Sequence, residues 1–159
     1  MLKELINYDP MQGAFFLLKD TKPYRQIFPD DEGYLIFYKK GKKYKIKANK
    51  LAVELGNNLR VPKEKVVLHK NLDTSDYRLQ NLSLITRKAF NSVKEAQRNL
   101  SSYLKLVPHN QDVFSYVLNW REEGKDRVLV VQDIVIARRM FNKLQLKYAK
   151  ILSKYCVFD

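Results

Sequence analysis

Two short apolar runs flank a polar loop in the middle of the 159-residue chain, and this feature limits the possible folds most strongly. Val66–Leu68 and Leu82–Ile85 are too short for helices, while the polar residues 70–78 between them suit a loop. Residues 87–103 then follow with helix-forming side chains. Those spaced to share one helical face are Phe90, Val93 and Leu100. The order predicts two strands and a helix that enclose a polar loop.

Strand and turn signals before this segment predict antiparallel β-hairpins and one helix. The expected elements are strands over 14–18, 34–38 and 43–47, turns at 9–13 and 40–42, and a helix over 48–55 that ends at 56–58. Leu51, Ala52 and Leu55 share one face of that helix. The N-terminal part is therefore expected to be mostly β-structure.

The C-terminal part predicts a small antiparallel sheet and one long helix. Strands are expected over 113–120 and 127–131, and Asp133 suits the N-cap of an amphipathic helix that runs to about residue 154. The apolar stripe of this helix is Ile134, Ala137, Phe141, Leu144, Tyr148 and Ile151 or Leu152. The whole chain is predicted to be α+β, with domains over 1–100 and 101–159.

The polar loop carries a specific pattern. It runs Leu68-His69-Lys70-Asn71-Leu72-Asp73 and then Asp76-Tyr77-Arg78-Leu79-Gln80-Asn81-Leu82, before a strand that ends in Thr86-Arg87. This pattern resembles the HNH endonuclease family, also called ββα-metal, in its phage homing-endonuclease form. The turn at 9–13 resembles the opening turn of that family, so the resemblance covers roughly residues 7–95.

The resemblance implies a site for phosphodiester hydrolysis. His69 would be the general base, since neutral imidazole accepts protons near neutral pH. Asn81 would hold the imidazole ring from the facing strand. A divalent cation, Mg²⁺ or Mn²⁺, would stabilise the phosphate charge. Asn91 and Asp73 are the expected metal ligands.

Two positions depart from the metal-ligand pattern of the family. Leu68 stands where many members carry an acidic or histidine ligand, and Phe90 stands where Asn or His is usual. Asp73 also suits a turn. A second interpretation therefore stays open, in which the chain is a catalytically decayed HNH-fold protein that only binds DNA.

A net charge of +13 predicts a polyanionic partner, and double-stranded DNA fits the motif best. Residues 39–120 hold seventeen Lys and Arg against six Asp and Glu. The expected phosphate contacts in this region are Lys39, Lys40, Lys42, Lys43, Lys45, Lys47, Arg78 and Arg87. The alternative for the lysine run is a solvated strand edge.

The order of strands and helix over 104–152 resembles the Apetala-type DNA-binding domain. Phe114, Tyr116, Leu118 and Trp120 are expected to face the core. The opposite face would carry Ser115, Asn119 and Arg121, joined by Arg127, and Arg and Asn suit contacts to base edges. Ordinary exposed residues are the alternative.

Composition argues against several other classes. No run approaches the ~20 apolar residues of a membrane span, and the N-terminus lacks the apolar run of a signal peptide. The single cysteine, Cys156, excludes an internal disulfide. We therefore expect a cytoplasmic protein of a phage-infected bacterial cell. A basic RNA-binding or ribosome-associated protein is a further alternative, and the sequence does not indicate an oligomeric state.

Overall fold

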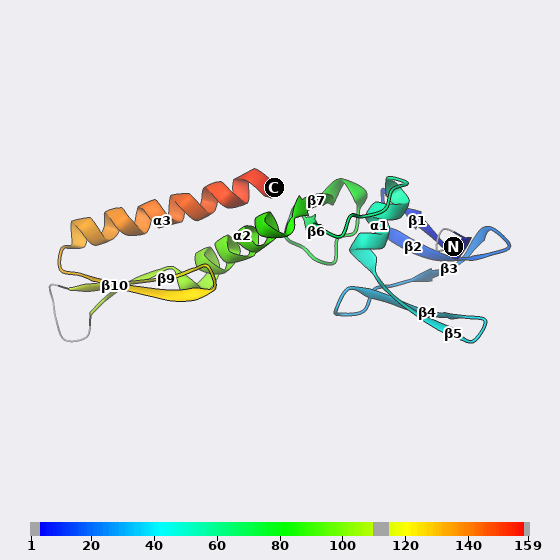
Figure 1. Ribbon diagram of the computed structural model, residues 1–159, viewed down its shortest axis with the longest axis horizontal. Coiled ribbons are helices and arrows are strands. Elements are labelled where there is room, and N and C mark those ends of the chain that lie inside the picture. The colour runs from blue at the N-terminus through cyan, green and yellow to red at the C-terminus, as the bar shows by residue number, and fades with distance from the viewer. Residues whose placement is uncertain (1–3, 110–114, 158–159) are drawn as a thin grey trace. The chain divides into compact units, whose positions relative to one another are not determined.

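The computed structural model describes residues 4–109 and 115–157, and the chain divides into two compact units (Figure 1). Unit 1 comprises Met1–Arg87 with Val157–Asp159, and unit 2 comprises Lys88–Cys156. Helices and antiparallel sheets occur together, and the chain ends in a long helix, which confirms the α+β prediction. The predicted boundary between residues 100 and 101 lies inside unit 2, and the division into a nuclease-like domain and a DNA-binding domain stays a prediction.

Unit 1 is built from antiparallel strands around one helix. Its elements are β1 (Ile6–Asp9), β2 (Ala14–Lys19), β3 (Lys22–Ile27), β4 (Tyr34–Lys39), β5 (Lys42–Lys47), α1 (Ala48–Gly56), β6 (Lys65–His69), a 3-10 turn (Leu79–Asn81) and β7 (Leu82–Thr86). Strands β1–β2–β3 form one sheet, and β4–β5 and β6–β7 are hairpins. The predicted strands, turns and helix of this part are confirmed. Strands β1 and β3 were not predicted, because β1 has four residues and β3 is polar and mostly exposed.

Helix α1 forms the centre of unit 1. Its residues Leu51, Ala52 and Val53 are buried, and the helix contacts β1, β5, β6 and β7. The core around it includes Phe15 and Leu35 from two different sheets. Because the strands around α1 are short, this shared core holds β6 and β7 in place, and the polar loop that joins them is thereby anchored at both ends.

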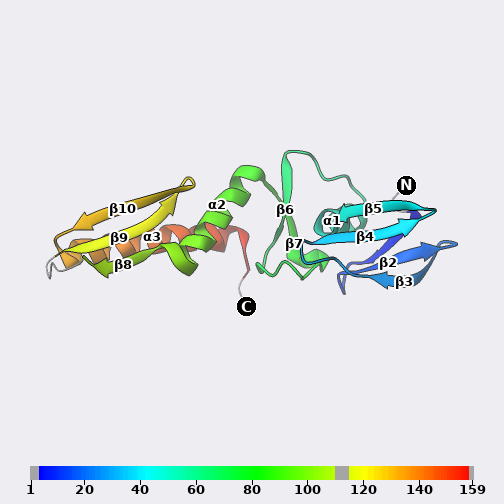
Figure 2. The same cartoon turned by 90° about the horizontal axis from the view of Figure 1, so that it is seen from below.

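Unit 2 places one helix against a three-stranded sheet. Its elements are α2 (Arg87–Arg98, which begins at the last residue of unit 1), a π-helical turn (Asn99–Tyr103), β8 (Lys105–Pro108), β9 (Tyr116–Glu122), β10 (Lys125–Val131) and α3 (Ile134–Tyr155). The strand order is β10–β9–β8, and α3 lies along one face of the sheet (Figure 2). The Asp133 cap is confirmed, since its Oδ1 accepts hydrogen bonds from the N–H groups of Val135 and Ile136. Ala137, Tyr148 and Leu152 of the predicted stripe are buried.

The helix predicted over 87–103 changes its geometry near its end. Leu104 N–H donates to Asn99 O, and this wider turn rotates Leu100 outward, where it is 39% exposed. The predicted place of Leu100 on the buried face is wrong. Asn99 is buried instead, and its side-chain amide exchanges hydrogen bonds with the backbone N–H and C=O of Arg121.

The register of β9 corrects part of the predicted sheet faces. Val113 and Phe114 lie outside the described residues, and Ser115 is buried rather than exposed. Leu118 is fully buried, as predicted for the core face. Arg127 lies directly opposite Trp120, so it lies on the α3 side and does not join Asn119 and Arg121. Among the described residues, no helix has the length and apolar character needed to cross a membrane.

Candidate functional site

His69 ends β6 and lies opposite Leu82, the first residue of β7. Its side chain is 7% exposed, and its ring packs edge-on against Tyr77. His69 Nδ1 lies 3.0 Å from the backbone oxygen of Asp76. Because a carbonyl oxygen only accepts hydrogen bonds, Nδ1 carries the proton, and the lone pair of the neutral ring is on Nε2. The loop therefore fixes the tautomer in which Nε2 is the proton acceptor.

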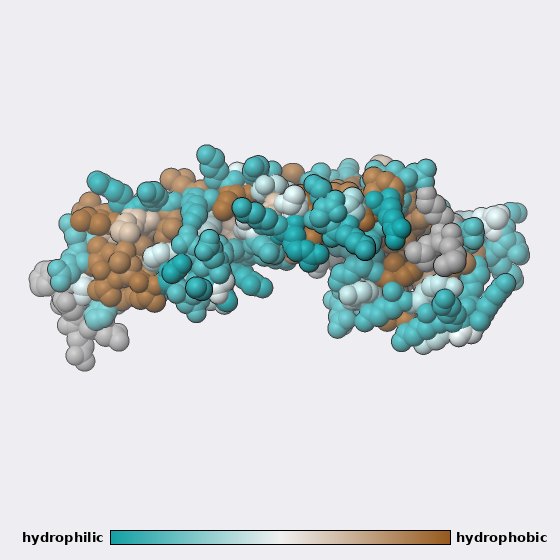
Figure 3. Space-filling view, viewed as in Figure 1, coloured by the Kyte–Doolittle hydropathy of each residue, from teal (hydrophilic) through white to brown (hydrophobic). Residues whose placement is uncertain are grey.

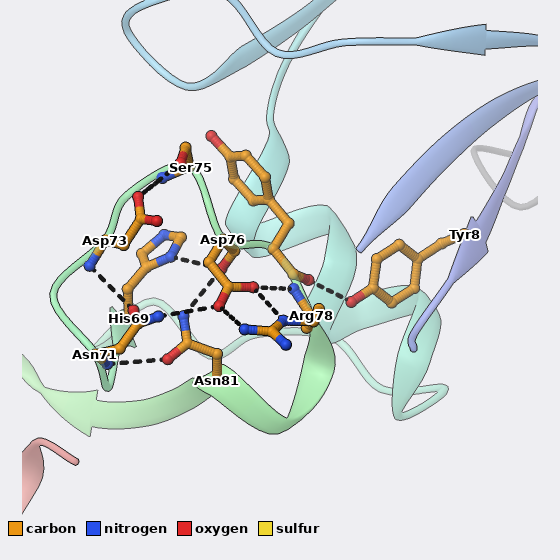
Figure 4. A network of polar contacts seen from close by, with 9 residues as sticks. Tyr8, His69, Asn71, Asp73, Ser75, Asp76, Arg78 and Asn81 are labelled. Atoms are coloured by element: carbon orange, nitrogen blue, oxygen red, sulfur yellow. Dashed lines mark hydrogen bonds and ion pairs between the residues drawn. The ribbon is translucent and has the colours of Figure 1, made fainter. Parts of the chain in front are cut away.

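Asn81 binds the same carbonyl from the other side of the loop (Figure 4). Its Nδ2 donates to Asp76 O over 3.0 Å, and its Oδ1 accepts from Asn71 N–H over 2.9 Å. Asn81 is 7% exposed, so both bonds are protected from water. The predicted partnership of His69 and Asn81 thus has a specific form, in which Asn81 fixes the acceptor that holds the imidazole.

The carboxylate of Asp76 holds the loop together. It accepts two side-chain hydrogen bonds from Arg78 and one from Asn71 Nδ2. The Arg78 hydrogen bonds are the largest cause that lowers the pKa of Asp76 from 3.8 to about 2, with burial opposing them. The sequence analysis did not predict this role of Asp76. Arg78 was predicted to bind DNA, and its guanidinium is engaged here by Asp76.

We expect the loop to lose stability in acid through Asp76. Its pKa is lowered in the fold, so the carboxylate stabilises the fold fully above about pH 3.8, and this contribution is lost as pH falls towards 2. Urea unfolding of wild type and Asp76→Asn across this range measures it. The two proteins should differ in unfolding free energy at neutral pH and converge near pH 2. A constant difference at all pH values would contradict the assignment.

The N-terminal turn supports the loop from outside. Asp9 Oδ1 accepts hydrogen bonds from two N–H groups of this turn, Pro10 O accepts from Leu79 N–H, and Tyr8 Oη donates to Tyr77 O over 2.6 Å. Burial raises the pKa of Tyr8 to about 12, so its hydroxyl stays protonated as a donor. The sequence analysis predicted this turn but not its contact with the loop.

Gly13 makes the closest approach of the turn to the loop. Its φ is +69°, and a Cβ there would lie 2.6 Å from Arg78 N and 2.7 Å from Tyr77 C. Gly13→Ala therefore adds steric overlap to the left-handed strain, about 1–3 kcal/mol beyond the roughly 1–2 kcal/mol of strain alone. Gly41→Ala is the matched control, since Gly41 has φ +73° and nothing within 4 Å of a Cβ. Equal losses of unfolding free energy in the two variants would show that Gly13 is not needed for the close contact between the turn and the loop.

The residues around His69 do not form a ready-made metal site. Asp73 accepts hydrogen bonds from Ser75 N–H and Oγ, and the Ser75 hydroxyl is the largest cause that lowers the Asp73 pKa. Leu68 is a buried apolar side chain, and Asn91 is exposed on α2 in unit 2. Within residues 4–109 and 115–157, no group of three His, Cys, Asp or Glu side chains is placed to hold a metal ion. Asp73 therefore stabilises a turn of the loop, which is the alternative role that the sequence analysis gave it.

The hairpin β4–β5 presents a basic face. Register places Lys43, Lys45 and Lys47 opposite Tyr38, Ile36 and Tyr34 on its outer side, while Leu35 and Phe37 enter the core. Alternate residues of a strand lie about 6.6–6.8 Å apart, so three cations form a row. Lys45 and Lys47 both lie over the Tyr34 ring, and Lys45 pairs with Glu32. Lys40 and Lys42 are also exposed, whereas Lys39 is half-buried.

The side chains of unit 2 that were predicted to bind DNA have partners within the unit or are half-buried. Arg121 donates to Tyr103 Oη and Gly124 O, and its backbone is held by Asn99. Arg127 lies within 4.0 Å of Glu122, and Asn119 is half-buried. Arg87, which begins α2 but is the last residue of this segment of unit 1, is exposed. The roles of all four in DNA binding stay predictions.

Comparison with known families identifies the segment around His69. Residues 58–91 match the family model HNH_3, described as HNH endonuclease. No curated protein and no solved structure matches the chain. The match spans β6, the loop with His69, Asn71, Asp76 and Asn81, and β7, so this segment carries an HNH endonuclease motif, which indicates nuclease chemistry on a nucleic-acid substrate.

Proposed function

We propose that the chain is a DNA endonuclease of the phage HNH homing type, which hydrolyses phosphodiester bonds with His69 as general base. The observation that carries this proposal is the hydrogen bond from His69 Nδ1 to Asp76 O. It leaves Nε2 with the lone pair, as a base that activates water requires. The match of residues 58–91 to HNH endonucleases supports the reaction class.

The proposed step transfers one proton to the ring. His69 Nε2 takes a proton from water as the water oxygen attacks phosphorus, and the bond from phosphorus to the leaving oxygen breaks. That oxygen takes up a proton from solvent. The Asp76 carbonyl, fixed by Asn81, already accepts from Nδ1–H and so stabilises the imidazolium that forms.

The proposed substrate is double-stranded DNA in the cytoplasm of a phage-infected bacterium. The basic face of β4–β5 supports a polyanionic substrate, because exposed Lys43, Lys45 and Lys47 form a row on one strand. Such contacts give affinity without reading sequence. Lys39, Lys40, Lys42, Arg78 and Arg87 are proposed to add to this surface, and Asn119, Arg121 and Arg127 to contact DNA from unit 2.

A divalent cation, Mg²⁺ or Mn²⁺, belongs to the proposal through the resemblance to the family. Mg²⁺ is commonly held by one or two protein carboxylates together with substrate phosphates, so a sparse ligand set is compatible with its use. Asp73 and Asn91 remain the proposed ligands. Dependence of cleavage on added metal, with loss in a chelator, is the direct test.

A specific observation favours one other function. Leu68 is buried where many HNH enzymes carry a ligand, and Asp76 is bound by Arg78. A decayed HNH fold that binds DNA without cutting it would have both features. This alternative predicts salt-sensitive DNA binding and no cleavage with any divalent ion.

A plasmid-cleavage assay tests the proposal. The full chain is incubated with supercoiled phage-like DNA in Mg²⁺, in Mn²⁺ and in a chelator, and a structured RNA is added as competitor. Metal-dependent nicks or breaks that persist with the RNA are the expected result. Binding without cleavage over a broad set of DNA sequences favours the decayed protein. Displacement of DNA by equimolar RNA overturns the choice of substrate.

A further inference from the structure

Helix α3 has an unusual distribution of charge. Its 22 residues include Arg138, Arg139, Lys143, Lys147, Lys150 and Lys154, and they include no Asp or Glu. Lys147 pairs with Glu122 of β9. Within the part of the chain that the structure describes, Arg139, Lys143 and Lys150 have no acidic group within 4.0 Å. Most of the positive charge of this helix is therefore not neutralised inside unit 2.

The cations lie on the side of α3 that faces away from the sheet. Ala137, Tyr148 and Leu152 are the buried residues of the helix, and at 100° per residue Arg139, Lys143 and Lys150 point in the opposite direction. We call this the outer helix face; it comprises Val135, Arg139, Asn142, Lys143, Leu146 and Lys150. A shallow hollow runs along part of it, and Figure 3 shows hydrophilic side chains that project from this helix.

The sheet of unit 2 offers a much weaker positive surface. Its face away from α3 carries exposed Val107, Val128 and Val130. Among the described residues that face carries two cations, Lys105 and Arg121, and Arg121 lies opposite Asp126 and donates to Tyr103 Oη. A polyanion gains little from valines and from a guanidinium that already has partners, so the charge favours the helix over the sheet.

We propose that the outer helix face is a second nucleic-acid docking surface, on which the phosphate backbone of duplex DNA binds Arg139, Lys143 and Lys150. This inference rests on the proposed nucleic-acid substrate and adds the place where unit 2 holds it. Arg139 and Lys150 are 11 positions apart, about 16–17 Å along the helix, which is enough for the three cations to contact several phosphates of one duplex. The contacts are electrostatic, so they add affinity without sequence preference.

The pattern favours nucleic acid over an anionic membrane surface. An interfacial helix buries an apolar face in lipid and carries its cations on the polar side. In α3 the continuous apolar face is already packed in unit 2, and cations occupy the middle of the remaining face. Val135 and Leu146 are 62% and 71% exposed there, but Arg139 and Lys143 lie between them. Binding to an anionic membrane surface is therefore measured alongside binding to DNA.

The test compares two triple variants of the full chain with equal loss of charge. Arg139→Gln, Lys143→Gln and Lys150→Gln neutralise the outer helix face. In the second, the sheet variant, Lys105→Gln and Lys125→Gln neutralise two exposed cations of the sheet, and Arg98→Gln neutralises one at the end of α2. Affinity for a 30-base-pair duplex is measured by fluorescence anisotropy over a range of salt concentrations, with circular dichroism to confirm folding. Binding to vesicles that contain anionic lipid is measured in parallel.

The expected result is a shallower salt dependence for the helix variant alone. Losing three phosphate contacts reduces the slope of log K against log salt by about 2.7, and the sheet variant changes it by less than about one. Equal slopes for wild type and the helix variant overturn the inference while leaving the proposed nuclease intact. Equal effects of both variants, or helix-dependent binding to vesicles but not to DNA, also overturn it. A wild type that binds no duplex overturns both proposals.

Discussion

Replacing His69 by Asn is expected to reduce DNA cleavage by about 10²–10⁴-fold, the usual contribution of a general base. Asn places an N–H donor close to the position of Nδ1, so the hydrogen bond to Asp76 O can be kept while Nε2 is removed. The ring is buried and belongs to the β6–β7 hairpin, whereas the lysine face belongs to β4–β5, so DNA affinity should stay at the wild-type level. The loss should therefore appear in kcat, measured by single-turnover nicking of plasmid DNA.

The chain supplies a matched control for this variant. His109 is the second of two histidines; it is exposed, and its backbone N–H pairs with Ser115 O. His109→Ala should cleave at the wild-type rate. His69→Ala is a harsher companion, since it also removes the contact with Tyr77 and the bond to Asp76 O. Wild-type cleavage by His69→Asn, with folding verified, would disprove the role of His69 as base.

Periodicity predicted most of the fold because the elements of this chain are marked locally. The apolar runs of β6 and β7, the turn at Gly41 and the Asp133 cap each act within a few residues. The missed strands β1, β3 and β8 are short, polar or exposed, and they exist because a neighbouring strand pairs with them. Such strands are determined by tertiary context rather than by their own residues.

In the candidate site, the sequence predicted the two side chains but not the backbone atom that both of them bind. His69 and Asn81 stood out because strand ends and spacing place them together. Their common acceptor is a backbone oxygen, that of Asp76, and a sequence pattern of side chains does not reveal a backbone acceptor. The contact of Gly13 with Tyr77 and Arg78 joins segments over sixty residues apart, and only the folded chain brings them together.

The unusual buried residue Asn99 illustrates the same limit in unit 2. A helical face of apolar residues predicted Leu100 inside, and the π-helical turn instead buries an amide that pairs with the backbone of β9. Polar side chains are buried where they complete the hydrogen bonds of a backbone that has no other partner. That need arises from the sheet and not from the helix sequence.

Replacing Asn81 by Ala is expected to lower the free energy of unfolding by about 2–4 kcal/mol. The change removes the partner of Asn71 N–H and one of two donors to Asp76 O, and each unpaired buried polar group costs about 1–3 kcal/mol. Both bonds are well formed, at 2.9 and 3.0 Å, and Asn81 is buried. Urea unfolding followed by circular dichroism measures the loss. Cleavage should fall by about 10²-fold as well, because a loose loop misplaces the base.

Two further variants separate the role of Asn81 from general damage to the loop. Gln80 is the exposed neighbour with the same functional group, so Gln80→Ala should keep both stability and cleavage. Asn81→Asp keeps the acceptor for Asn71 N–H but sets a carboxylate oxygen against Asp76 O in place of a donor. It should therefore lose cleavage without weaker DNA binding. If Asn81→Asp instead matches wild type in kcat, then the carbonyl of Asp76 does not need Asn81 to hold His69.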